Sequence, residues 1–260
     1  MSLMHKILET PVKPNELAVC FLGQNGFIFR SHDLTLGVDL YLSNSCAEDT
    51  GITQALGFKL DRALPIPISP RELELDLILA THEHKDHADP ETLLGVEKEE
   101  TRFAGPWPVL KLLSDLGFPG DRCFELSEGQ SKTIGSVTLS AVFARHVPGS
   151  VGYILEMGGL KIYMTGDSEF DERLFMVADL FPDLMFVCIN GRWGNMTGDE
   201  AVELVRRIRP KVVVPTHYDM FAANSADPCA FADALRESKC GSRPLVLEVG
   251  TVLILSQAIL

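Results

Sequence analysis

Apolar runs separated by short turn segments dominate the first third of the chain. Residues 16–31 contain two such runs on either side of Gly23-Gln24-Asn25-Gly26, a composition that predicts a β-hairpin. The apolar positions of 35–43 predict a third strand. The segment LDLILA at 75–80 is apolar nearly throughout, which is typical of a strand that is buried on both faces.

Capping residues mark the starts of the predicted helices. Asp89, followed by a proline, opens a helix over 89–96, since aspartate caps free N–H groups and proline suits the first turn. Thr197 and Glu200 form a capping box that opens a helix over 197–209. Apolar positions at helical spacing predict three more helices, at 107–117, 169–181 and 227–239.

Helix and strand patterns alternate in the second half of the chain. Residues 151–158 and 161–167 predict a hairpin that turns at Gly158-Gly159. The other predicted strands lie at 136–146, 183–190 and 211–217, and the last two strands fall within 243–255. The first half of the chain is rich in predicted strands, and in the second half strands alternate with helices. This order predicts an α/β fold in which two mixed β-sheets pack together with helices outside.

Residues 44–74 interrupt this pattern. They are rich in proline, glycine and serine, which predicts an irregular insertion placed over an active site. The chain has 260 residues, of which 46% are hydrophobic and 23% charged. This length and composition predict one globular domain over 1–260, with the insertion as part of it.

The net charge of −13 at pH 7 restricts the partners of the protein. Such a surface repels phosphate backbones, so we expect no nucleic acid partner. The basic run at 206–211 falls at a helix end, where positive charge complements the helix dipole. Six cysteines without a C-x-x-C pair indicate reduced thiols in a cytoplasmic protein. Neither a membrane-spanning apolar stretch nor a signal-peptide core is evident, so we expect no membrane partner.

Ionisable side chains crowd the loop that follows the buried strand. The stretch LILATHEHKDH, residues 77–87, carries three histidines, a glutamate and an aspartate. His82 and His84 project together, because residues two apart in an extended chain point to the same side. Asp86 and His87 fall at the turn into the next helix, so four metal-ligating side chains converge from one loop. Loops after the carboxyl ends of strands are where α/β sheets place their sites.

Three further strands each end on a candidate ligand. His146 ends VFARH, Asp167 ends IYMTGD and His217 ends VVVPTH. Imidazole and carboxylate groups suit zinc, iron or manganese. No cysteine belongs to the set, which argues against a closed structural zinc site. The sequence therefore predicts a centre for one or two divalent metal ions, built from segments far apart in the chain.

The order H-x-H-x-D-H, followed by a later histidine, aspartate and histidine, resembles the metallo-β-lactamase superfamily over essentially the whole chain. The resemblance implies an αββα sandwich with the metals at one edge. It also implies that Asp39, at the end of an early strand, supports the metal loop from outside the ligand set. By the superfamily pattern the first metal is held by His82, His84 and His146, the second by Asp86, His87 and His217, and Asp167 bridges them.

Other motifs resemble the branch of this superfamily that contains L-ascorbate-6-phosphate lactonase and its relatives. The superfamily resemblance implies zinc, whereas the branch implies manganese, a small-molecule substrate and an assembly of identical subunits. The matching segments are FLGQNGFIF (21–29), DLYLSNS (39–45), ARHVPGSVGYILE (144–156), INGRWGNMT (189–197) and THYDMFAANSADPCAF (216–231).

This resemblance implies a metal-dependent hydrolase that opens an ester or lactone, in its narrower form a phosphorylated sugar lactone. A metal at the site lowers the pKa of a bound water to about 7, so that hydroxide forms at neutral pH and attacks the carbonyl carbon. Asp86 is expected beside this hydroxide as the catalytic proton acceptor.

A phosphorylated substrate requires a counter-charge on a protein that is negative overall. Arg192 is the first candidate, since a guanidinium makes bidentate contacts to phosphate. Asn190, close to it in the segment INGRWGN, is a second candidate contact. Tyr218 directly follows His217 and is expected to line the substrate pocket.

Four alternatives remain at this stage. A phosphodiesterase or nuclease such as ribonuclease Z shares the implied fold, but the net charge and the lack of a basic arm argue against it. A thioester hydrolase would use the same hydroxide. A flavodiiron oxidoreductase would need a flavin domain and a glutamate ligand. A non-catalytic metal-bound scaffold would not need an open coordination position, so the full ligand set favours an enzyme.

Overall fold

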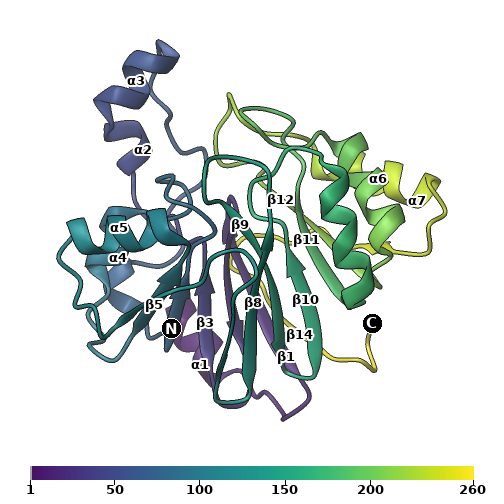
Figure 1. Cartoon of the computed structure of the whole chain (residues 1–260), viewed down its shortest axis with the longest axis horizontal. Coiled ribbons are helices and arrows are strands. Elements are labelled where there is room, and N and C mark those ends of the chain that lie inside the picture. Colours follow the sequence, from purple (N-terminus) through teal and green to yellow (C-terminus); the bar gives the residue numbers. More distant parts are fainter. Residues whose placement is uncertain (1) are drawn as a thin grey trace.

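Two β-sheets face each other in the computed structural model, which describes residues 2–260 (Figure 1). Within that range each sheet has seven strands. The first sheet has the order β14 (Val252–Leu255), β1 (Leu17–Gly23), β2 (Gly26–Arg30), β3 (Thr35–Val38), β4 (Leu77–Leu79), β5 (Arg102–Gly105) and β6 (Cys123–Glu125). The second has the order β13 (Arg243–Pro244), β12 (Val212–Thr216), β11 (Leu184–Cys188), β10 (Leu160–Met164), β9 (Val151–Met157), β8 (Val137–Phe143) and β7 (Ser131–Ile134).

Both sheets are mixed. In the first, β14, β1, β2 and β3 pair antiparallel, and β3 to β6 pair parallel. In the second, β7 to β10 pair antiparallel, and β10 to β13 pair parallel. The parallel strands β4 and β11 are buried at every position, which explains why their sequences are apolar runs without polar alternation.

Aromatic side chains join the two sheets. The ring of Phe186 on β11 packs edge-on against Phe27 and Phe29 of β2, with centroids 4.7 and 5.4 Å apart. Phe27 also stacks on Phe21 of β1 at 4.9 Å. All four rings are buried, and edge-to-face contacts of this kind favour a fixed arrangement of the two sheets. The predicted sheet-on-sheet core is confirmed.

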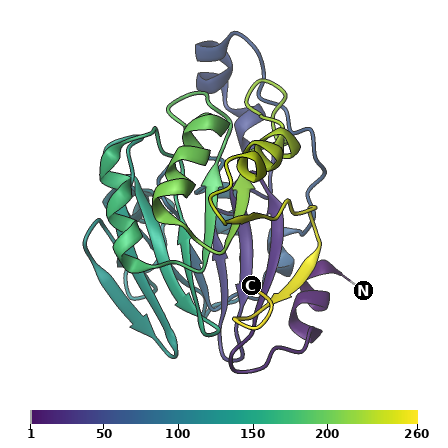
Figure 2. The same cartoon turned by 90° about the vertical axis from the view of Figure 1, so that its right-hand side faces the viewer.

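Helices cover the outer face of each sheet (Figure 1, Figure 2). The first sheet shares a hydrophobic cluster with α1 (Leu3–Glu9), α4 (Pro90–Gly95) and α5 (Trp107–Asp115). The second sheet contacts α6 (Gly198–Ile208) and α7 (Pro228–Glu237), and the 3-10 helix η2 (Glu172–Leu180) packs beside α6. The predicted αββα sandwich is therefore confirmed. No helix in the described range is both long and apolar enough to cross a bilayer.

The predicted helix caps are present. Asp89 accepts from the backbone N–H groups of Glu91 and Thr92 at the start of α4. Thr197 and Glu200 form the capping box of α6. The helix predicted over 169–181 is instead the 3-10 helix η2. The spacing of apolar residues does not distinguish the i to i+3 hydrogen bonds of a 3-10 helix from the i to i+4 bonds of an α-helix. Strands β5, β6 and β7, and helix α1, are present although the sequence did not predict them.

The segment 44–74 is less irregular than predicted. It contains α2 (Ser45–Glu48), α3 (Thr50–Leu56) and the 3-10 turn η1 (Pro70–Glu72). Asp49 caps α3 by accepting from the N–H groups of Gly51 and Ile52, and Gly57 ends it in the left-handed conformation at φ 79°. These short helices form because local caps satisfy their free backbone groups. In Figure 1, α2 and α3 project beyond the two sheets at the rim.

Candidate metal centre

The loop after β4 turns sharply and fixes its own ligands. His87 and Ala88 both donate their backbone N–H to the carbonyl oxygen of His84, at 2.9 and 2.7 Å. The turn brings the ring of His87 back beside that of His82, with centroids 4.2 Å apart. Four candidate side chains from one short loop thus reach the same rim, as the sequence predicts.

Three imidazoles from the two sheets form the first group of donors. Nε2 of His82 lies 3.0 Å from Nδ1 of His84, which lies 3.3 Å from Nε2 of His146. His82 and His84 follow β4 of the first sheet, and His146 follows β8 of the second. Donor nitrogens of all three lie within 4.8 Å of one another. This spacing suits one divalent ion among them.

Asp86, His87 and His217 form the second group. Nε2 of His217 lies 3.5 Å from Oδ2 of Asp86, and Nε2 of His87 lies 3.7 Å from the same oxygen. His217 follows β12, so this group also joins both sheets. Its donor atoms again lie within 4.8 Å of one another.

Asp167, after β10, lies between the two groups. Its Oδ1 is 3.3 Å from Nε2 of His87, and its Oδ2 is 3.2 Å from Nε2 of His217. Oδ2 also lies 3.8 Å from Nε2 of His146 in the first group. One carboxylate therefore contacts both donor groups, which is the position a bridging ligand requires.

Among the described residues, the buried atoms at this centre without a hydrogen-bond partner include Nε2 of His87 and Oδ1 of Asp167. They lie 3.3 Å apart. A buried polar atom without a partner destabilises a fold by about 1–3 kcal/mol, and a cation between the two would contact both. The imidazole and carboxylate donors also suit a divalent ion. The cluster is therefore able to bind metal.

Asp39 supports the loop from behind. Its carboxylate is buried and accepts from Nδ2 of Asn25 at 2.6 Å, from both the N–H and Oγ1 of Thr81 at 2.7 and 2.8 Å, and from Nδ1 of His87 at 2.8 Å. The last bond leaves Nε2 of His87 free to face the centre. Asp39 has φ 49°, a conformation that aspartate tolerates better than most residues.

Gln24 is a site residue that the sequence did not single out. It is fully buried in the turn between β1 and β2, and its Nε2 donates to Oδ2 of Asp86 at 2.7 Å. The same Nε2 lies 3.0 Å from Nε2 of His217, whose backbone N–H donates to the carbonyl of Gln24 at 2.7 Å. The available signal was a pair of amide side chains, Gln24 and Asn25, inside a tight turn between two apolar strands.

Charge at the centre is balanced by protons when no metal is present. Burial alone would lower the pKa of His217, but Asp167 and Asp86 raise it to about 9. Burial would also lower the pKa of His87, but the carboxylates of Asp167, Asp39 and Asp86 outweigh it and hold this pKa well above its usual range. At Asp86, burial is outweighed by His87 and His217, so its pKa is lowered and the carboxylate is ionised. The buried carboxylates thus require positive charge beside them.

In the first donor group, burial lowers the pKa of His82 and His84 and is not outweighed by neighbouring carboxylates. It lowers the pKa of His82 well below its usual value, and the neighbouring His87 adds to this effect. The pKa of His84 is also lowered, mainly by burial. Neutral imidazoles offer a lone pair, which is the form that binds a metal ion.

A cavity of about 360 Å³ opens above the cluster. His84, Asp86, His146 and Asp167 contribute to its lining, together with side chains of α3 and of the loop after β11. Its size lies at the lower end of the range for small-molecule sites, roughly 300–1,000 Å³. The segment 44–74 therefore contributes to the wall over the centre, in the position predicted for it.

The residues predicted to bind substrate do not line this cavity. Arg192 is exposed, and its Nη1 donates to the carbonyl oxygen of Ala223 at 3.3 Å. Asn190 donates to Oδ1 of Asn224 at 2.7 Å and accepts from Nδ2 of Asn195 at 3.0 Å. Asn195 and Asn224 line the cavity, so Asn190 orders two wall residues instead of facing the cavity itself.

The expectation that Tyr218 lines the pocket is wrong. Its hydroxyl donates to the carbonyl oxygen of Leu247 at 2.8 Å, and its ring packs 5.4 Å from that of Phe21 in the core. The preceding His217 faces the metal centre and has φ 66°, so the backbone leaves the extended conformation after β12 and turns before Tyr218. A residue next to a ligand in sequence is therefore directed away from the site.

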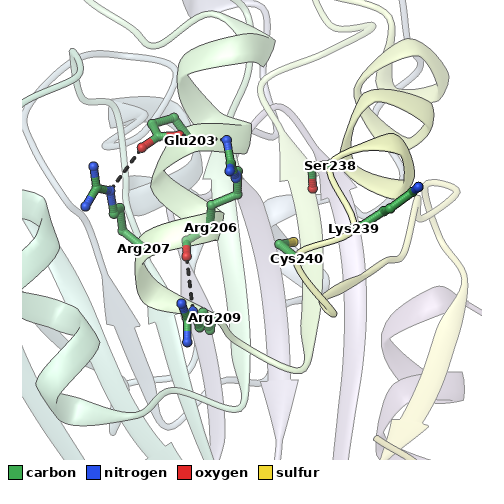
Figure 3. Close-up of a pocket in the computed structure, with 7 residues that line it drawn as sticks. All are labelled: Glu203, Arg206, Arg207, Arg209, Ser238, Lys239 and Cys240. Carbon is green, nitrogen blue, oxygen red and sulfur yellow. Dashed lines mark hydrogen bonds and ion pairs between the residues drawn. The ribbon is translucent and has the colours of Figure 1, made fainter.

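A second groove, of about 440 Å³, lies at the carboxyl-terminal ends of α6 and α7 (Figure 3). Arg206 and Arg207 both pair with Glu203, at 3.4 and 3.0 Å, and Nε of Arg209 donates to the carbonyl of Arg206 at 3.4 Å. These arginines therefore form ion pairs with an acidic side chain and interact favourably with the carboxyl-terminal end of the helix, as the sequence predicts for 206–211. The groove contains none of the metal-centre residues.

The fold and the centre together define a class of protein. A family model described as "Beta-lactamase superfamily domain" matches residues 48–218, which include the whole ligand set up to His217. The αββα sandwich and the His/Asp cluster at its rim agree with this match. The chain therefore belongs to the metallo-β-lactamase superfamily of metal-dependent hydrolases.

Individual relatives narrow the assignment. A UPF0173 metal-dependent hydrolase of Hyperthermus butylicus is 27% identical over 205 residues, covering 74% of this chain and 88% of the relative. A UPF0173 protein of Pyrococcus abyssi is 30% identical over 156 residues, covering 59% and 71%. Within the superfamily the chain thus falls in the UPF0173 family. The solved structure of Igni18, a metallo hydrolase from Ignicoccus hospitalis, shares the fold with a TM-score of 0.73 at 20% identity, covering 93% of this chain and 99% of that one.

Proposed function

We propose that this protein hydrolyses an ester or lactone by a metal-dependent attack of water on the carbonyl carbon. One observation carries the proposal: the two donor groups, joined by Asp167, border an open cavity through His84, His146 and Asp86 instead of forming a closed cluster. An open position beside the ligands is the feature that separates a catalytic from a structural metal site.

The bound ion would be held by the two donor groups. Its chemistry is to acidify a water molecule and to polarise the carbonyl oxygen. Asp86 accepts the proton of the attacking water, because it is ionised and its side chain remains 17% accessible at the floor of the cavity. Gln24 holds this carboxylate in place through its 2.7 Å hydrogen bond.

The bonds formed and broken are those of ordinary ester hydrolysis. The water oxygen bonds to the carbonyl carbon, the carbon–oxygen bond to the alcohol breaks, and the proton taken up by Asp86 passes to the leaving oxygen. In a lactone that oxygen stays tethered, so the product is an open hydroxy acid. Asn195 and Asn224 on the cavity wall offer amide groups that orient the substrate.

A narrower form of the proposal is a phosphorylated sugar lactone, which the resemblance to the ascorbate-6-phosphate lactonase branch supports. Arg192 is the residue that this form requires, and its guanidinium would have to leave the carbonyl of Ala223 to reach the cavity. Replacing Arg192 with alanine should then raise KM for a phosphorylated lactone far more than for an unphosphorylated one. Equal effects on both substrates would remove Arg192 from this role.

Two other activities of the same fold compete with this proposal. A thioester hydrolase would use the same attack on a carbonyl, and a phosphodiesterase would need to bring an anionic backbone to a chain of net charge −13. Turnover of lactones, esters, thioesters and phosphodiesters, measured with metal analysis of the purified protein, separates the three.

The role of the metal centre is tested by His84→Ala. This change should abolish hydrolysis and leave a folded protein, because His84 lies at the rim of the cluster and is solvent-accessible. His32→Ala, at an exposed histidine after β2, is the matched control and should retain full turnover. Unchanged turnover in His84→Ala would reject the mechanism.

A further inference from the structure

The cavity above the metal centre has a polar floor and an apolar mouth. The floor consists of ligand side chains, whereas Ile52, Leu56, Leu60 and Trp193 contribute to the walls. Trp193 is exposed, Ile52 and Leu56 are half-buried, and Leu60 is buried. Apolar side chains that line a concave surface favour an apolar ligand. The chemistry of these walls therefore bears on the substrate.

One wall is the apolar side of α3. Ile52 and Leu56 are one turn apart and line the cavity together, although no residue of α3 is fully buried. Asp49, the N-cap of α3, pairs with Lys85 of the metal loop, with Oδ2 and Nζ 2.5 Å apart. This ion pair holds the helix over the centre. In Figure 1, α3 projects beyond both sheets. Ile52 and Leu56 pack against the small cluster of Tyr41, Leu60 and Phe221 but are only partly buried there, so part of their apolar surface remains open to the cavity.

Trp193, in the loop after β11, also lines the cavity. Its side chain is 47% exposed, and its backbone has φ 50°, a conformation that bulky residues adopt only where the surroundings enforce it. The loop is closed by a hydrogen bond from the N–H of Gly191 to the carbonyl of Met196 at 2.8 Å. The carbonyl of Gly194 accepts from Nδ1 of His146 at 2.9 Å, which fixes the loop to a metal-centre residue. An exposed tryptophan is thus held rigidly beside the reacting position.

The charges of the cavity do not favour an anionic substituent. Asp49 and Glu83 add negative charge to its walls. Among the described residues that line it, the lysine is Lys85, and it already pairs with Asp49. Arg192 lies outside the lining, bonded to the carbonyl of Ala223. A phosphate group far from the metal would therefore meet carboxylates without a free cation, whereas an apolar group would meet matching surface.

We infer that the substrate is an ester or lactone with an uncharged apolar acyl or alkyl substituent of a few carbons, packed between Trp193 and the Ile52–Leu56 side of α3 while its carbonyl lies at the metal centre. This inference rests on the proposed function for the chemistry of the head group. The apolar substituent is assigned from the residues that line the cavity walls.

The first test uses straight-chain p-nitrophenyl esters from acetate to hexanoate, together with γ-lactones with and without an alkyl substituent, on the metal-loaded protein. We expect kcat/KM to rise by up to about fourfold for each added methylene, the gain from burying one in apolar surroundings. In Trp193→Ala and in Leu56→Asn, the ratio of kcat/KM for hexanoate to that for acetate should fall at least tenfold.

The matched control is Phe181→Ala. Phe181 is also an exposed aromatic residue with a positive φ, 51°, but it ends η2 and lies outside the cavity. This variant should keep the wild-type ratio. A ratio that stays unchanged in Trp193→Ala, or that falls equally in Phe181→Ala, would overturn the inference.

The second test measures binding without turnover. In a Trp107→Phe background Trp193 is the single tryptophan, so its fluorescence reports titration with butanoate, pentanoate and hexanoate. We expect the dissociation constant to fall with each methylene. If no ester or lactone is hydrolysed but binding still tightens with chain length, the proposed function fails and the apolar site stands. If hydrolysis occurs with no dependence on chain length, or with preference for a phosphorylated lactone, the inference fails and the proposed function stands.

Discussion

Nδ1 of His87 lies 2.8 Å from Oδ2 of Asp39, and both side chains are fully buried. The same carboxylate binds Asn25 and Thr81, so its position is set by two other segments of the chain, the β1–β2 turn and the loop after β4. The bond directs Nε2 of His87 toward Asp86 and Asp167. Partners of this kind outside the ligand set orient a metal-binding imidazole and raise its basicity.

Asp39→Asn should weaken metal binding without unfolding the protein. The amide keeps the shape of the carboxylate but removes the charge that orients His87, and changes of this kind lower metal affinity by about 10–100-fold. Titration of metal-free protein against a competing chelator measures the affinity. Asp61→Asn, at an exposed carboxylate, is the control. Equal affinities in the two variants would contradict the role given to Asp39.

Gln24→Ala should also weaken metal binding, through the second donor group. The change removes the hydrogen bond to Oδ2 of Asp86 and the contact with His217. Loss of a partner outside the ligand set predicts an affinity lower by about tenfold. Isothermal titration provides the measurement, with Gln54→Ala on the exposed side of α3 as the matched control. An affinity within twofold of wild type would show that Asp86 is held by other contacts.

Metal binding should release protons at neutral pH. In the metal-free centre the pKa of His217 is raised to about 9 and that of His87 lies well above its usual value, so both are protonated at pH 7. A ligand imidazole must be neutral, so the metal displaces these protons and its affinity rises as pH approaches about 9. Titration at pH 7 in buffers of different ionisation enthalpy measures the release. A heat of binding that is the same in every buffer would be incompatible with charged histidines.

Phe186→Ala should destabilise the fold strongly. Phe186 packs edge-on against Phe27 and Phe29 and so joins the two sheets, both of which contribute ligands to the metal centre. Truncation of a buried phenylalanine lowers the free energy of unfolding by about 3–5 kcal/mol. Denaturant titration checks this value. Phe58→Ala, at a ring that is 44% exposed, should change stability by less than about 0.5 kcal/mol. Similar values for the two variants would place the inter-sheet contact elsewhere.

Much of the fold could be predicted from local patterns. The β1–β2 hairpin, the cap at Asp89 and the capping box at Thr197 depend on neighbours within a few residues, and all three are present. Strands β6 and β7 were not predicted, because they are three and four residues long and carry exposed positions. β6 is held by pairing with β5 across α5, and β7 by a hairpin with β8. Helix α3 was missed because its cap at Asp49 lies in a segment rich in turn-forming residues.

The sequence by itself determined which side chains could meet at a metal centre, since His82 to His87, His146, Asp167 and His217 each directly follow a strand and strand ends share a rim. Only the tertiary structure decided what surrounds them. Packing between segments far apart in the chain buries Tyr218 in the core, brings Gln24 to Asp86 and places Trp193 in the lining of the same cavity as α3. Local spacing can specify the direction of a side chain at a strand end, but the partner it meets depends on how the two sheets and their loops pack together.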